Sequence, residues 1–445
     1  MLYYISTRKY FGFTLAACII YLIYSTGDGI TTQNFITENY YHRWNPESKN
    51  DIFKRPPLDS EAIRDICSAT SWNRSLLFTC DNNSGDVAKV RNSILNCVRY
   101  TISAGGSLIL PRILEREMDP STKEDSSNQS NQSSRRGLDY MFDEKHFLDS
   151  LQRSCPELVL VSKMTDTGDY GGRRRSLLPE SLFPNLPTSG LEHPEEWPQK
   201  LNSWIEENII SSPSTAGSPI IIDLEASFLH YPTHSDGHAA AHVFGNILQF
   251  RSDIRHLATK TLSRLVDWYE FPVNISHHGL LKPSFLGAHL NTENPLLEQR
   301  HLFDVEFSHY EAQAEAFLQQ ASDLQLSTIY ISSENYSDLE EFCLDALSYN
   351  VAVTFKEALL DQEDLTNLNR LTYDQREMVD FLVLTKAEEF VGIGHSPYSW
   401  NVALAREQLG AVMDGKLNGD IWKDGMNTLF GVRKDYVESS YCMWS

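Results

Sequence analysis

A strand, a glycine turn, a helix and a second strand follow one another within residues 76–111, and this order constrains the fold more than any other feature. Leu76–Thr79 is a short apolar segment, and the turn after it contains Gly85. The next segment, to about Ser103, carries apolar residues on one helical face, and Ser107–Pro111 is apolar again. Two strands joined by a helix usually pair in parallel, so this segment predicts a βαβ unit and an α/β fold.

The second half of the chain repeats this alternation. Strands are expected at Ser284–Leu290, Ser327–Ser332 and Val351–Phe355, with helices at Tyr310–Gln319 and from Thr372 into Phe381. A chain of 445 residues is also too long for one ordinary domain, and its 41% hydrophobic content is enough for two cores. We therefore predict two Rossmann-like domains that face each other across a cleft.

The N-terminus carries an uncharged hydrophobic run from Tyr10 to Gly27, preceded by Arg8 and Lys9. This length is near the lower limit for crossing a bilayer, and the basic residues favour a cytoplasmic N-terminus. We expect a single transmembrane helix with a luminal body, in the Golgi or the endoplasmic reticulum. A cleaved signal peptide, which would give a secreted protein, is the alternative that this length also permits.

These observations divide the chain into expected segments. They are a cytoplasmic tail at 1–9, a transmembrane signal anchor at 10–27, a luminal stem at 28–60, an N-terminal Rossmann-like domain at 61–275 with a disordered Ser/Asn/Gln-rich insertion at 119–137, and a C-terminal Rossmann-like domain at 276–445.

Sequons and cysteines agree with a luminal body. Acceptor triplets for N-glycosylation begin at Asn73, Asn82, Asn128, Asn131, Asn274 and Asn335. Apart from Cys18 in the hydrophobic run, the cysteines are Cys67, Cys80, Cys97, Cys155, Cys343 and Cys442. Their even number predicts disulfides in an oxidising compartment, but the sequence does not choose among the pairings.

The formal net charge of −22 argues against nucleic acid as a partner. A protein that binds nucleic acid or an anionic membrane surface needs a clustered positive field. The longest basic run, Arg173–Arg175, lies next to glycines and is typical of an exposed loop.

Several short motifs follow one another between about residues 60 and 410. They are Leu77–Cys80 with Gly85-Asp86 and Val90–Asn92, Gly105–Pro111, Phe142–Phe147 with Cys155-Pro156, Tyr231-Pro232 with Asp236 and Phe244-Gly245, Phe285–Leu290, Tyr310–Gln313, Asp374-Gln375, Val379–Leu384 and Phe390–Trp400. Each of these motifs is common by itself. Their order and spacing, however, resemble those of the fungal branch of the GDP-fucose protein O-fucosyltransferase family.

The resemblance implies a glycosyltransferase of GT-B type that binds GDP-fucose mainly through its C-terminal domain. Such an enzyme transfers fucose to a protein or glycan hydroxyl with inversion, and uses no metal and no cofactor besides the donor substrate. Without a metal, preorganised cations or N–H donors must meet the charge that develops on the departing β-phosphate. In the family a His-x-Arg motif, a Ser/Thr-x-aromatic turn at a helix start and an upstream acidic residue serve the donor.

The family's residues map onto this chain one by one. His289 falls on the histidine of the His-x-Arg motif, and Asp380 falls on the acidic position expected at the guanine. Ser396, Tyr398 and Ser399 fall on the phosphate turn. In the N-terminal domain, the resemblance places a donor-binding role at the glycine turn that contains Gly85. No metal ligands are implied.

The main departure from the family is Asn291, which stands at the catalytic position where the motif has its arginine. Asparagine is neutral and cannot offer a charged bidentate fork, and losing such a contact reduces rates by on the order of 10²–10³. Pro397 in the phosphate turn also lacks a backbone N–H. Arg300 and Arg406 are the candidates to replace the missing charge. The alternative function is therefore a weak or inactive pseudoenzyme that binds glycans or partner proteins.

A histidine cluster offers a competing chemistry. His234, His238 and His242 have a spacing that a zinc site can use, but the glutamate of the metalloprotease motif is missing. Gly237 and a nearby proline also argue against a continuous helix there, so we expect a polar role and no metal.

Two further motifs have simpler interpretations. Gly394–Tyr398 begins like the nucleophile elbow of a hydrolase, but a tyrosine replaces its second glycine, which disfavours a secreted hydrolase. Asp143, Glu144 and His146 could form an acid–base group, although charged residues at a helix start more often interact with the helix dipole.

Overall fold

The protein is described here by a computed structural model. It describes residues 51–116, 135–162, 173–185, 190–210, 219–228, 230–276, 279–292, 307–333, 335–414, 421–431 and 442–444. The expected anchor at 10–27, most of the expected insertion at 119–137, and Arg300 lie outside these residues. Within the described parts of the chain, no helix combines the length and the apolar character needed to cross a bilayer.

The chain divides into two compact units. The N-terminal unit comprises Arg55–Ser252, Leu371–Met378 and Tyr436–Ser445, and the C-terminal unit comprises Met1–Lys54, Asp253–Arg370 and Val379–Asp435. The sequence placed the domain boundary after residue 275, whereas these units divide the chain after Ser252. The physical reason lies in helix α7 (Ser252–Trp268). Its Lys260 and Arg264 form ion pairs with acidic residues of the C-terminal unit.

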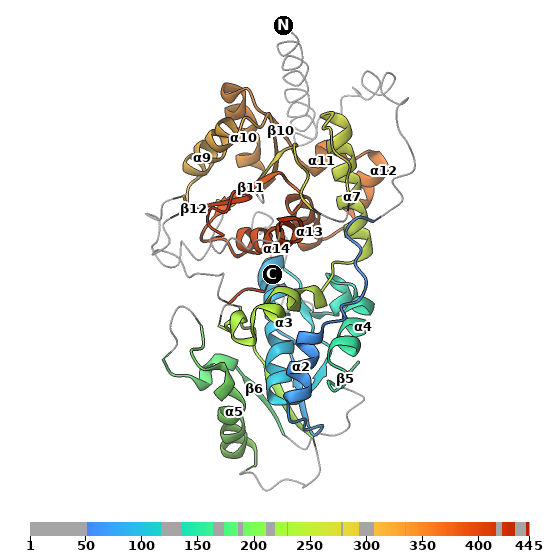
Figure 1. Cartoon of the computed structure of the whole chain (residues 1–445), viewed down its shortest axis with the longest axis vertical. Coiled ribbons are helices and arrows are strands. Elements are labelled where there is room, and N and C mark those ends of the chain that lie inside the picture. Colours follow the sequence, from blue (N-terminus) through green and yellow to red (C-terminus); the bar gives the residue numbers. More distant parts are fainter. Residues whose placement is uncertain are drawn as a thin grey trace, which may run out of the picture. The chain divides into compact units, whose positions relative to one another are not determined.

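The N-terminal unit is built on a five-stranded, fully parallel sheet in the order β5-β2-β1-β7-β6. Figure 1 labels its edge strands, β5 and β6. Its strands are β1 (Leu76–Thr79), β2 (Ser107–Ile109), β5 (Leu160–Val161), β6 (Arg174–Leu177) and β7 (Ile220–Leu224), with a separate antiparallel pair of β3 (Ile113–Leu114) and β4 (Arg135–Arg136). Its helices are α2 (Glu61–Ala69), α3 (Val87–Ala104), α4 (Glu144–Ser154), α5 (Trp197–Ile205) and α6 (His238–Val243). Short helical turns are η3 (Leu138–Tyr140), η5 (Pro179–Leu182), η6 (Pro194–Glu196), η7 (Glu206–Ile210), η8 (Thr233–Asp236) and η9 (Phe244–Ile247).

The predicted βαβ segment is confirmed as β1, α3 and β2. The helix begins where the Asp86 side chain accepts a hydrogen bond from the backbone N–H of Lys89 at 2.8 Å. It ends at Gly105, whose φ of +65° is a left-handed conformation that glycine adopts without strain. The chain then returns to pair β2 with β1 in parallel.

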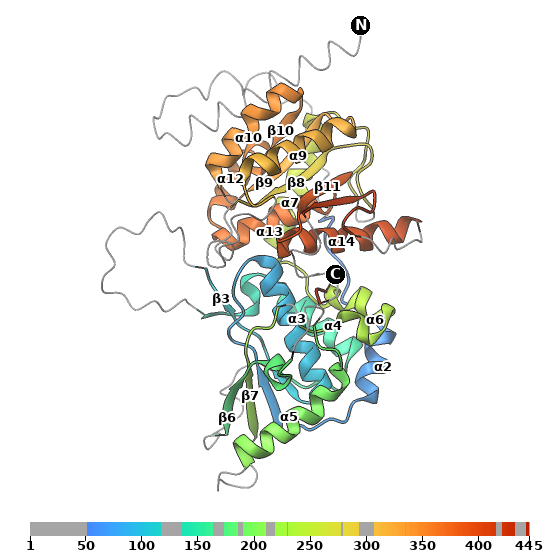
Figure 2. The same cartoon turned by 90° about the vertical axis from the view of Figure 1, so that its left-hand side faces the viewer.

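The C-terminal unit repeats the architecture with a parallel sheet in the order β10-β9-β8-β11-β12. Its strands are β8 (Leu286–Leu290), β9 (Thr328–Ser333), β10 (Ala352–Thr354), β11 (Glu389–Ile393) and β12 (Asn427–Phe430). Besides α7, its helices are α9 (Tyr310–Asp323), α10 (Tyr336–Tyr349), α11 (Lys356–Leu359), α12 (Gln362–Asn369), the second half of α13 (Tyr373–Leu384) and α14 (Pro397–Asp414). Helices α9 and α10 pack against β8 and β9 (Figure 2). The predicted α/β fold with parallel sheets is therefore confirmed.

In each sheet the chain forms three strands in one direction and then crosses to the other side of the first strand; in the N-terminal unit it forms the edge strand β6 there before β7. In the C-terminal unit the chain moves outward from β8 through β9 to β10, and then returns to the other side of β8 to form β11 and β12. The reversal therefore lies between β8 and β11; in the N-terminal unit it lies between β1 and β7. In open α/β sheets, ligands bind outside the carboxyl ends of the strands at this switch point.

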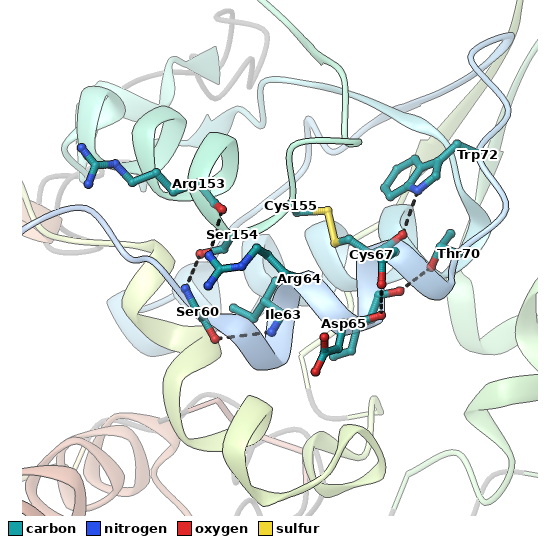
Figure 3. The surroundings of a disulfide bond; sticks show 12 residues. Ser60, Ile63, Arg64, Asp65, Cys67, Thr70, Trp72, Arg153, Ser154 and Cys155 are labelled. Atoms are coloured by element: carbon teal, nitrogen blue, oxygen red, sulfur yellow. Dashed lines mark hydrogen bonds between the residues drawn. A yellow bond between two sulfur atoms is a disulfide. The ribbon is translucent and has the colours of Figure 1, made fainter.

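The predicted disulfides are confirmed in part. Among the described residues the pairs are Cys67–Cys155 and Cys80–Cys97, both in the N-terminal unit. Figure 3 shows the first, which joins α2 to the residue that ends α4. Cys343 and Cys442 are buried and take part in neither of these disulfides. The structure therefore selects the pairing that the sequence left open.

Candidate functional site

The candidate site lies at the switch point of the C-terminal unit. His289 is the second-last residue of β8, and the turn of residues 394–396 follows β11 directly. The two strands pair in parallel, so their carboxyl ends reach the same edge of the sheet. Three of the residues that the sequence nominated, His289, Tyr398 and Ser399, meet at this edge.

The contact among these three residues is tight and buried. His289 Nδ1 lies 2.8 Å from Ser399 Oγ, and the His289 ring stacks on Tyr398 with ring centroids 4.3 Å apart. Ser399 Oγ also accepts a hydrogen bond from the backbone N–H of Ile393 at 3.3 Å. The hydroxyl has both a proton to donate and a second lone pair to accept with, so it can bond Nδ1 in either tautomer of the imidazole. The Ser399 contact thus orients the imidazole.

Helix α14 begins at this point. Ser396 acts as its N-cap: the Ser396 hydroxyl accepts a hydrogen bond from the backbone N–H of Ser399 at 3.2 Å. Pro397 occupies the first helical position, which proline favours because it has no N–H to satisfy. Pro397 therefore offers no N–H, and the N–H of Ser399 is engaged by the cap. Gly392 permits this packing, since a Cβ there would lie 2.5 Å from Ser399 Oγ.

Asn291 lies just beyond the end of β8, with its main chain held by a single side chain. Its N–H donates to Gln313 Oε1 at 2.9 Å, and its carbonyl accepts from Gln313 Nε2 at 2.7 Å. Gln313 is fully buried on α9 and also bonds the carbonyl of Phe307. The backbone at position 291 is therefore fixed, and the chemistry of this position depends on its side chain.

Asp380 belongs to a buried hydrogen-bond network, and the sequence nominated only Asp380 among its members. Its two carboxylate oxygens accept hydrogen bonds from the Tyr330 hydroxyl at 2.7 Å and from Lys356 Nζ at 2.6 Å. Burial raises the pKa of Asp380, and the Lys356 ammonium opposes that shift. Burial also opposes the charge on Lys356, but Asp380 and Glu357 together outweigh it and raise the pKa of Lys356.

Sequence reasoning did not nominate Lys356 and Tyr330. Lys356 follows β10 within two residues, and residues at the carboxyl ends of parallel strands gather at one edge of the sheet. That position was the available signal for Lys356. Tyr330 lies within β9 and carried no signal of its own.

Arg406 does not supply the charge that the arginine of the His-x-Arg motif would supply at position 291. Its guanidinium is fully buried and donates to the Asn427 side chain at 2.8 Å and to the carbonyls of Ala387 at 2.7 Å and Met426 at 2.8 Å. These contacts connect α14 to the segment between α13 and β11 and to the start of β12, within the C-terminal unit. Arg300, the other candidate, lies outside the described residues.

His395, within the turn, does not supply a cation at neutral pH. Burial lowers its pKa to about 4, so its imidazole is uncharged at pH 7. In the described part of this switch point, the donors toward an anion are therefore neutral groups and the N-terminus of α14.

Gly85 belongs to the N-terminal unit, so the structure does not group it with the other nominated residues. Its φ of +104° requires glycine, and it precedes Asp86, the N-cap of α3. Disulfide Cys80–Cys97 and the Asn83 side chain, which donates to the carbonyls of Cys80 and Arg112, hold this turn in place.

The competing motifs have structural roles. His238 and His242 stack on α6 with ring centroids 6.1 Å apart, and His234 lies on a separate turn. Within the described ranges, the only group of candidate metal ligands contains Cys67 and Cys155, which form a disulfide.

The two remaining motifs are helix caps. Ser396 is fully buried and caps α14, whereas the nucleophile of a hydrolase elbow exposes its hydroxyl. Asp143 caps α4 by accepting a hydrogen bond from the His146 N–H at 3.0 Å. The helix-start interpretation of Asp143 and its neighbours therefore accounts for them.

Comparison with known proteins was informative at the family level. A search of curated proteins found no match. Among solved structures, POFUT1 with GDP-fucose has a TM-score of 0.47 at 12% identity, covering 82% of this chain and 99% of that one. POFUT1 with GDP has a TM-score of 0.45 at 13% identity, covering 81% and 99%. The fucosyltransferase NodZ from Bradyrhizobium has a TM-score of 0.38 at 11% identity, covering 76% and 94%.

The family model described as GDP-fucose protein O-fucosyltransferase matches residues 76–409. The match begins at β1 and ends in α14, so it includes both parallel sheets up to β11 and the candidate site. The chain therefore belongs to the GDP-fucose protein O-fucosyltransferase family.

Proposed function

We propose that this protein binds GDP-fucose at the switch point of its C-terminal unit and transfers fucose, with inversion, to a hydroxyl of a protein or glycan acceptor. The observation that carries the proposal is the contact of His289 with Ser399 and Tyr398 at the carboxyl ends of β8 and β11. This contact lies at the edge where α/β sheets take their ligands, beside the start of an 18-residue helix.

The residues of this site serve the leaving group in the proposed reaction. When the bond to fucose breaks, negative charge grows on the β-phosphate, and the N-terminus of α14 favours that charge. Ser396 and Ser399 hold the helix start and the His289 ring in fixed positions, so little reorganisation is needed during the reaction. His289, oriented in this way, presents its other ring nitrogen, Nε2, to a hydrogen-bond partner.

A second function, binding without appreciable transfer, is favoured by the chemistry of position 291. Asn291 provides no charged fork, and Gln313 fixes its backbone. Arg406 is engaged inside the unit. The transition state therefore loses more stabilisation than the bound ground state, which lowers turnover more than affinity.

Calorimetry with GDP and GDP-fucose tests the proposal on the purified chain. Binding of GDP together with slow transfer to added acceptors supports the transferase, and binding without any transfer supports the second function. Absence of GDP binding contradicts both. Titration in EDTA tests the metal-free mechanism, because loss of binding in chelator would show that a divalent ion is required.

We also propose that the body of the protein is luminal. Asn73 and Asn274 begin sequons and are exposed in the structure, so both are accessible to glycosylation. Endoglycosidase treatment should lower the apparent mass of the protein, and an N-terminal tag should be digested by protease added to intact microsomes. An unchanged band or a protected tag would contradict this topology.

A further inference from the structure

Residues 442–444 belong to the N-terminal unit, although they are the last described residues in the sequence. They form neither a helix nor a strand, yet all three are buried, and Trp444 is one of the largest fully buried side chains of the described chain. The proposed function does not use them. A buried segment without secondary structure needs partners for its backbone groups, and here a neighbouring helix supplies them.

Helix α3 holds the backbone of this segment through two side chains. Asn92 Nδ2 donates to the carbonyl of Cys442 at 3.0 Å, and Asn92 Oδ1 accepts from the backbone N–H of Trp444 at 2.9 Å. Arg91 donates to the Trp444 carbonyl at 2.7 Å. An amide that bonds one backbone carbonyl and one backbone N–H recognises a peptide main chain and not a particular side chain.

The Trp444 side chain occupies an aromatic site next to this helix. Its Nε1 donates to Asn96 Oδ1 at 2.8 Å. Its ring centroid lies 4.4 Å from that of Phe244 and 5.8 Å from that of Tyr231. An indole suits this site because it combines a large apolar area with one N–H donor. Arg91, Asn92, Asn96, Tyr231 and Phe244 together are called the α3 site.

Contacts that do not involve the segment also hold the α3 site in place. Asn96 Nδ2 donates to the carbonyl of Ser227 at 2.7 Å, and Arg99 forms a buried ion pair with Asp236. Ser227 and Asp236 are the ends of the β7 loop (residues 227, 228 and 230–236), which follows β7 at the switch point of the N-terminal unit. The α3 site is therefore largely built before the segment binds.

Two acceptors of the α3 site depend on the segment. Among the described residues, the donor to Asn92 Oδ1 is the backbone N–H of Trp444, and the donor to Asn96 Oδ1 is its ring N–H. Both asparagines are fully buried, so an empty site would leave both oxygens without a partner. The sequence of α3 thus places two buried amides where a peptide with an indole ring satisfies them.

We propose that residues 442–444 are a peptide ligand bound in cis, and that the α3 site recognises a peptide that carries an indole side chain. When the site is occupied, Trp444 contacts both Asn96 of α3 and Tyr231 of the β7 loop. Occupancy therefore fixes this loop at an edge of the sheet where α/β proteins bind ligands. The proposal does not depend on GDP binding in the C-terminal unit.

The full-length variant Trp444→Gly tests the aromatic part of the site. Its Tm should fall by about 10 °C, as expected when a buried tryptophan site is emptied. Millimolar indole should restore part of this loss. Benzofuran, which has the same fused rings with an oxygen in place of the N–H, should restore less, because Asn96 Oδ1 stays unpaired. If the variant melts like the native protein, or if benzofuran and indole restore it equally, the proposal is wrong.

A peptide added in trans tests whether the site binds the segment as a ligand. A synthetic peptide of residues 440–445 with Cys442→Ala, which cannot oxidise, should bind the Trp444→Gly protein with a Kd of about 1 mM or tighter in titration calorimetry. The same peptide with Trp444→Ala in addition should bind about tenfold more weakly or not at all. Absence of binding by the first peptide, or equal binding of both, contradicts the proposal.

Hydrogen exchange shows where the bound segment acts. In the Trp444→Gly protein, amides of residues 230–236 should exchange about tenfold faster than in the native protein, and indole should slow them again. Amides of β1 and β2 should change much less. A uniform increase across the N-terminal unit would show that Trp444 is an ordinary core residue, and the proposal would then fail.

Two further variants keep the test decisive. Trp444→Phe keeps most of the ring packing and removes the hydrogen bond to Asn96, so it should fold even if Trp444→Gly does not, and faster exchange should be confined to the β7 loop. Trp268→Gly removes a tryptophan that is 43% exposed on α7 of the C-terminal unit, and indole should not raise its Tm. An equal effect of indole on this control would mean that indole binds elsewhere, and native exchange in Trp444→Phe would mean that Asn96 does not recognise the ring. Either result overturns the proposal.

Discussion

The two switch points of this protein differ in the charge at their helix starts. In the N-terminal unit, the carboxylate of Asp86 caps α3 and accepts the N–H of Lys89 at 2.8 Å. In the C-terminal unit, the neutral hydroxyl of Ser396 caps α14 and accepts the N–H of Ser399 at 3.2 Å. A carboxylate already occupies the place where a phosphate would bind, whereas a hydroxyl leaves the positive field of the helix available. The comparison supports the proposed site of the nucleotide in the C-terminal unit.

The units also differ in covalent bonding. Both disulfides found in the described residues lie in the N-terminal unit, and the buried Cys343 of the C-terminal unit belongs to neither. The core of the C-terminal unit is an apolar cluster of β8, β9, β10 and β11 with α9 and α10. The N-terminal unit is therefore stabilised by packing and by cross-links, whereas the described part of the C-terminal unit is stabilised by packing. The following predictions test these contrasts, from the largest expected effect to the smallest.

Removal of the Cys67–Cys155 disulfide should have the largest effect. Its cysteines are 88 residues apart in sequence, and a cross-link that closes a loop of this length stabilises a protein by about 4–5 kcal/mol. The double variant Cys67→Ser/Cys155→Ser should lower the free energy of unfolding of the N-terminal unit by about that amount in urea titrations. Removal of Cys80–Cys97, whose separation is 17, should lower it by about 3 kcal/mol. GDP affinity in calorimetry should stay unchanged, and a parallel loss of affinity would show that the two units are not independent.

Acidification should destabilise the C-terminal unit through His395. Its folded-state pKa of about 4 lies below the value of 6.5 for an unperturbed histidine, so the unfolded state takes up the proton first. Stability is therefore unaffected above about pH 6.5 and falls as the pH drops towards 4, by up to about 3 kcal/mol. His395→Gln should remove this part of the pH dependence in denaturation curves. His256→Gln, which changes an exposed histidine, should keep the native slope, and equal slopes for all three proteins would contradict the assignment.

Asn291→Arg should sharpen the contrast between the two switch points by restoring the charged fork. We expect GDP binding to strengthen by about 1.5–3 kcal/mol, the range for hydrogen bonds to charged groups. Turnover should rise by a larger factor, since the charge on the β-phosphate grows in the transition state. Asn291→Lys, which has the charge without the fork, should recover less. If the native protein already binds GDP as tightly as the arginine variant and turns over rapidly, another residue supplies the charge.

Cap variants should give the smallest effects and compare the helix starts directly. Asp86→Ala and Ser396→Ala should each lower the free energy of unfolding by about 1 kcal/mol, since each removes one N-cap. Ser396→Ala should also weaken GDP binding, whereas Asp86→Ala should not. Calorimetry and urea unfolding on both variants measure the two effects. Equal losses of GDP affinity would remove the distinction between the units.

Local features of this protein follow from the sequence alone. Apolar spacing predicted the βαβ segment, and the structure shows β1, α3 and β2 where they were expected. The expected helix at Tyr310–Gln319 begins at the same residue as α9, and the helix expected from Thr372 corresponds to α13. These elements depend on side-chain periodicity and capping within a few residues, so the sequence carries their signal. The sequence also identified the turn at residues 396–399, but it did not show which distant residues this turn contacts.

Tertiary structure decided which distant residues meet. His289 and Ser399 are 110 positions apart, and their hydrogen bond exists because β8 and β11 became neighbours when the sheet reversed its order. Asp380 of α13 meets Tyr330 of β9 and Lys356 of α11, which are 50 and 24 positions away in sequence. Only the packing of α2 against the end of α4 selected Cys155 as the partner of Cys67. Residue spacing along the chain carries no information about strand order or about burial against another element. The sequence therefore determined the elements and named residues at their ends, and the order of the strands brought His289 and Ser399 together.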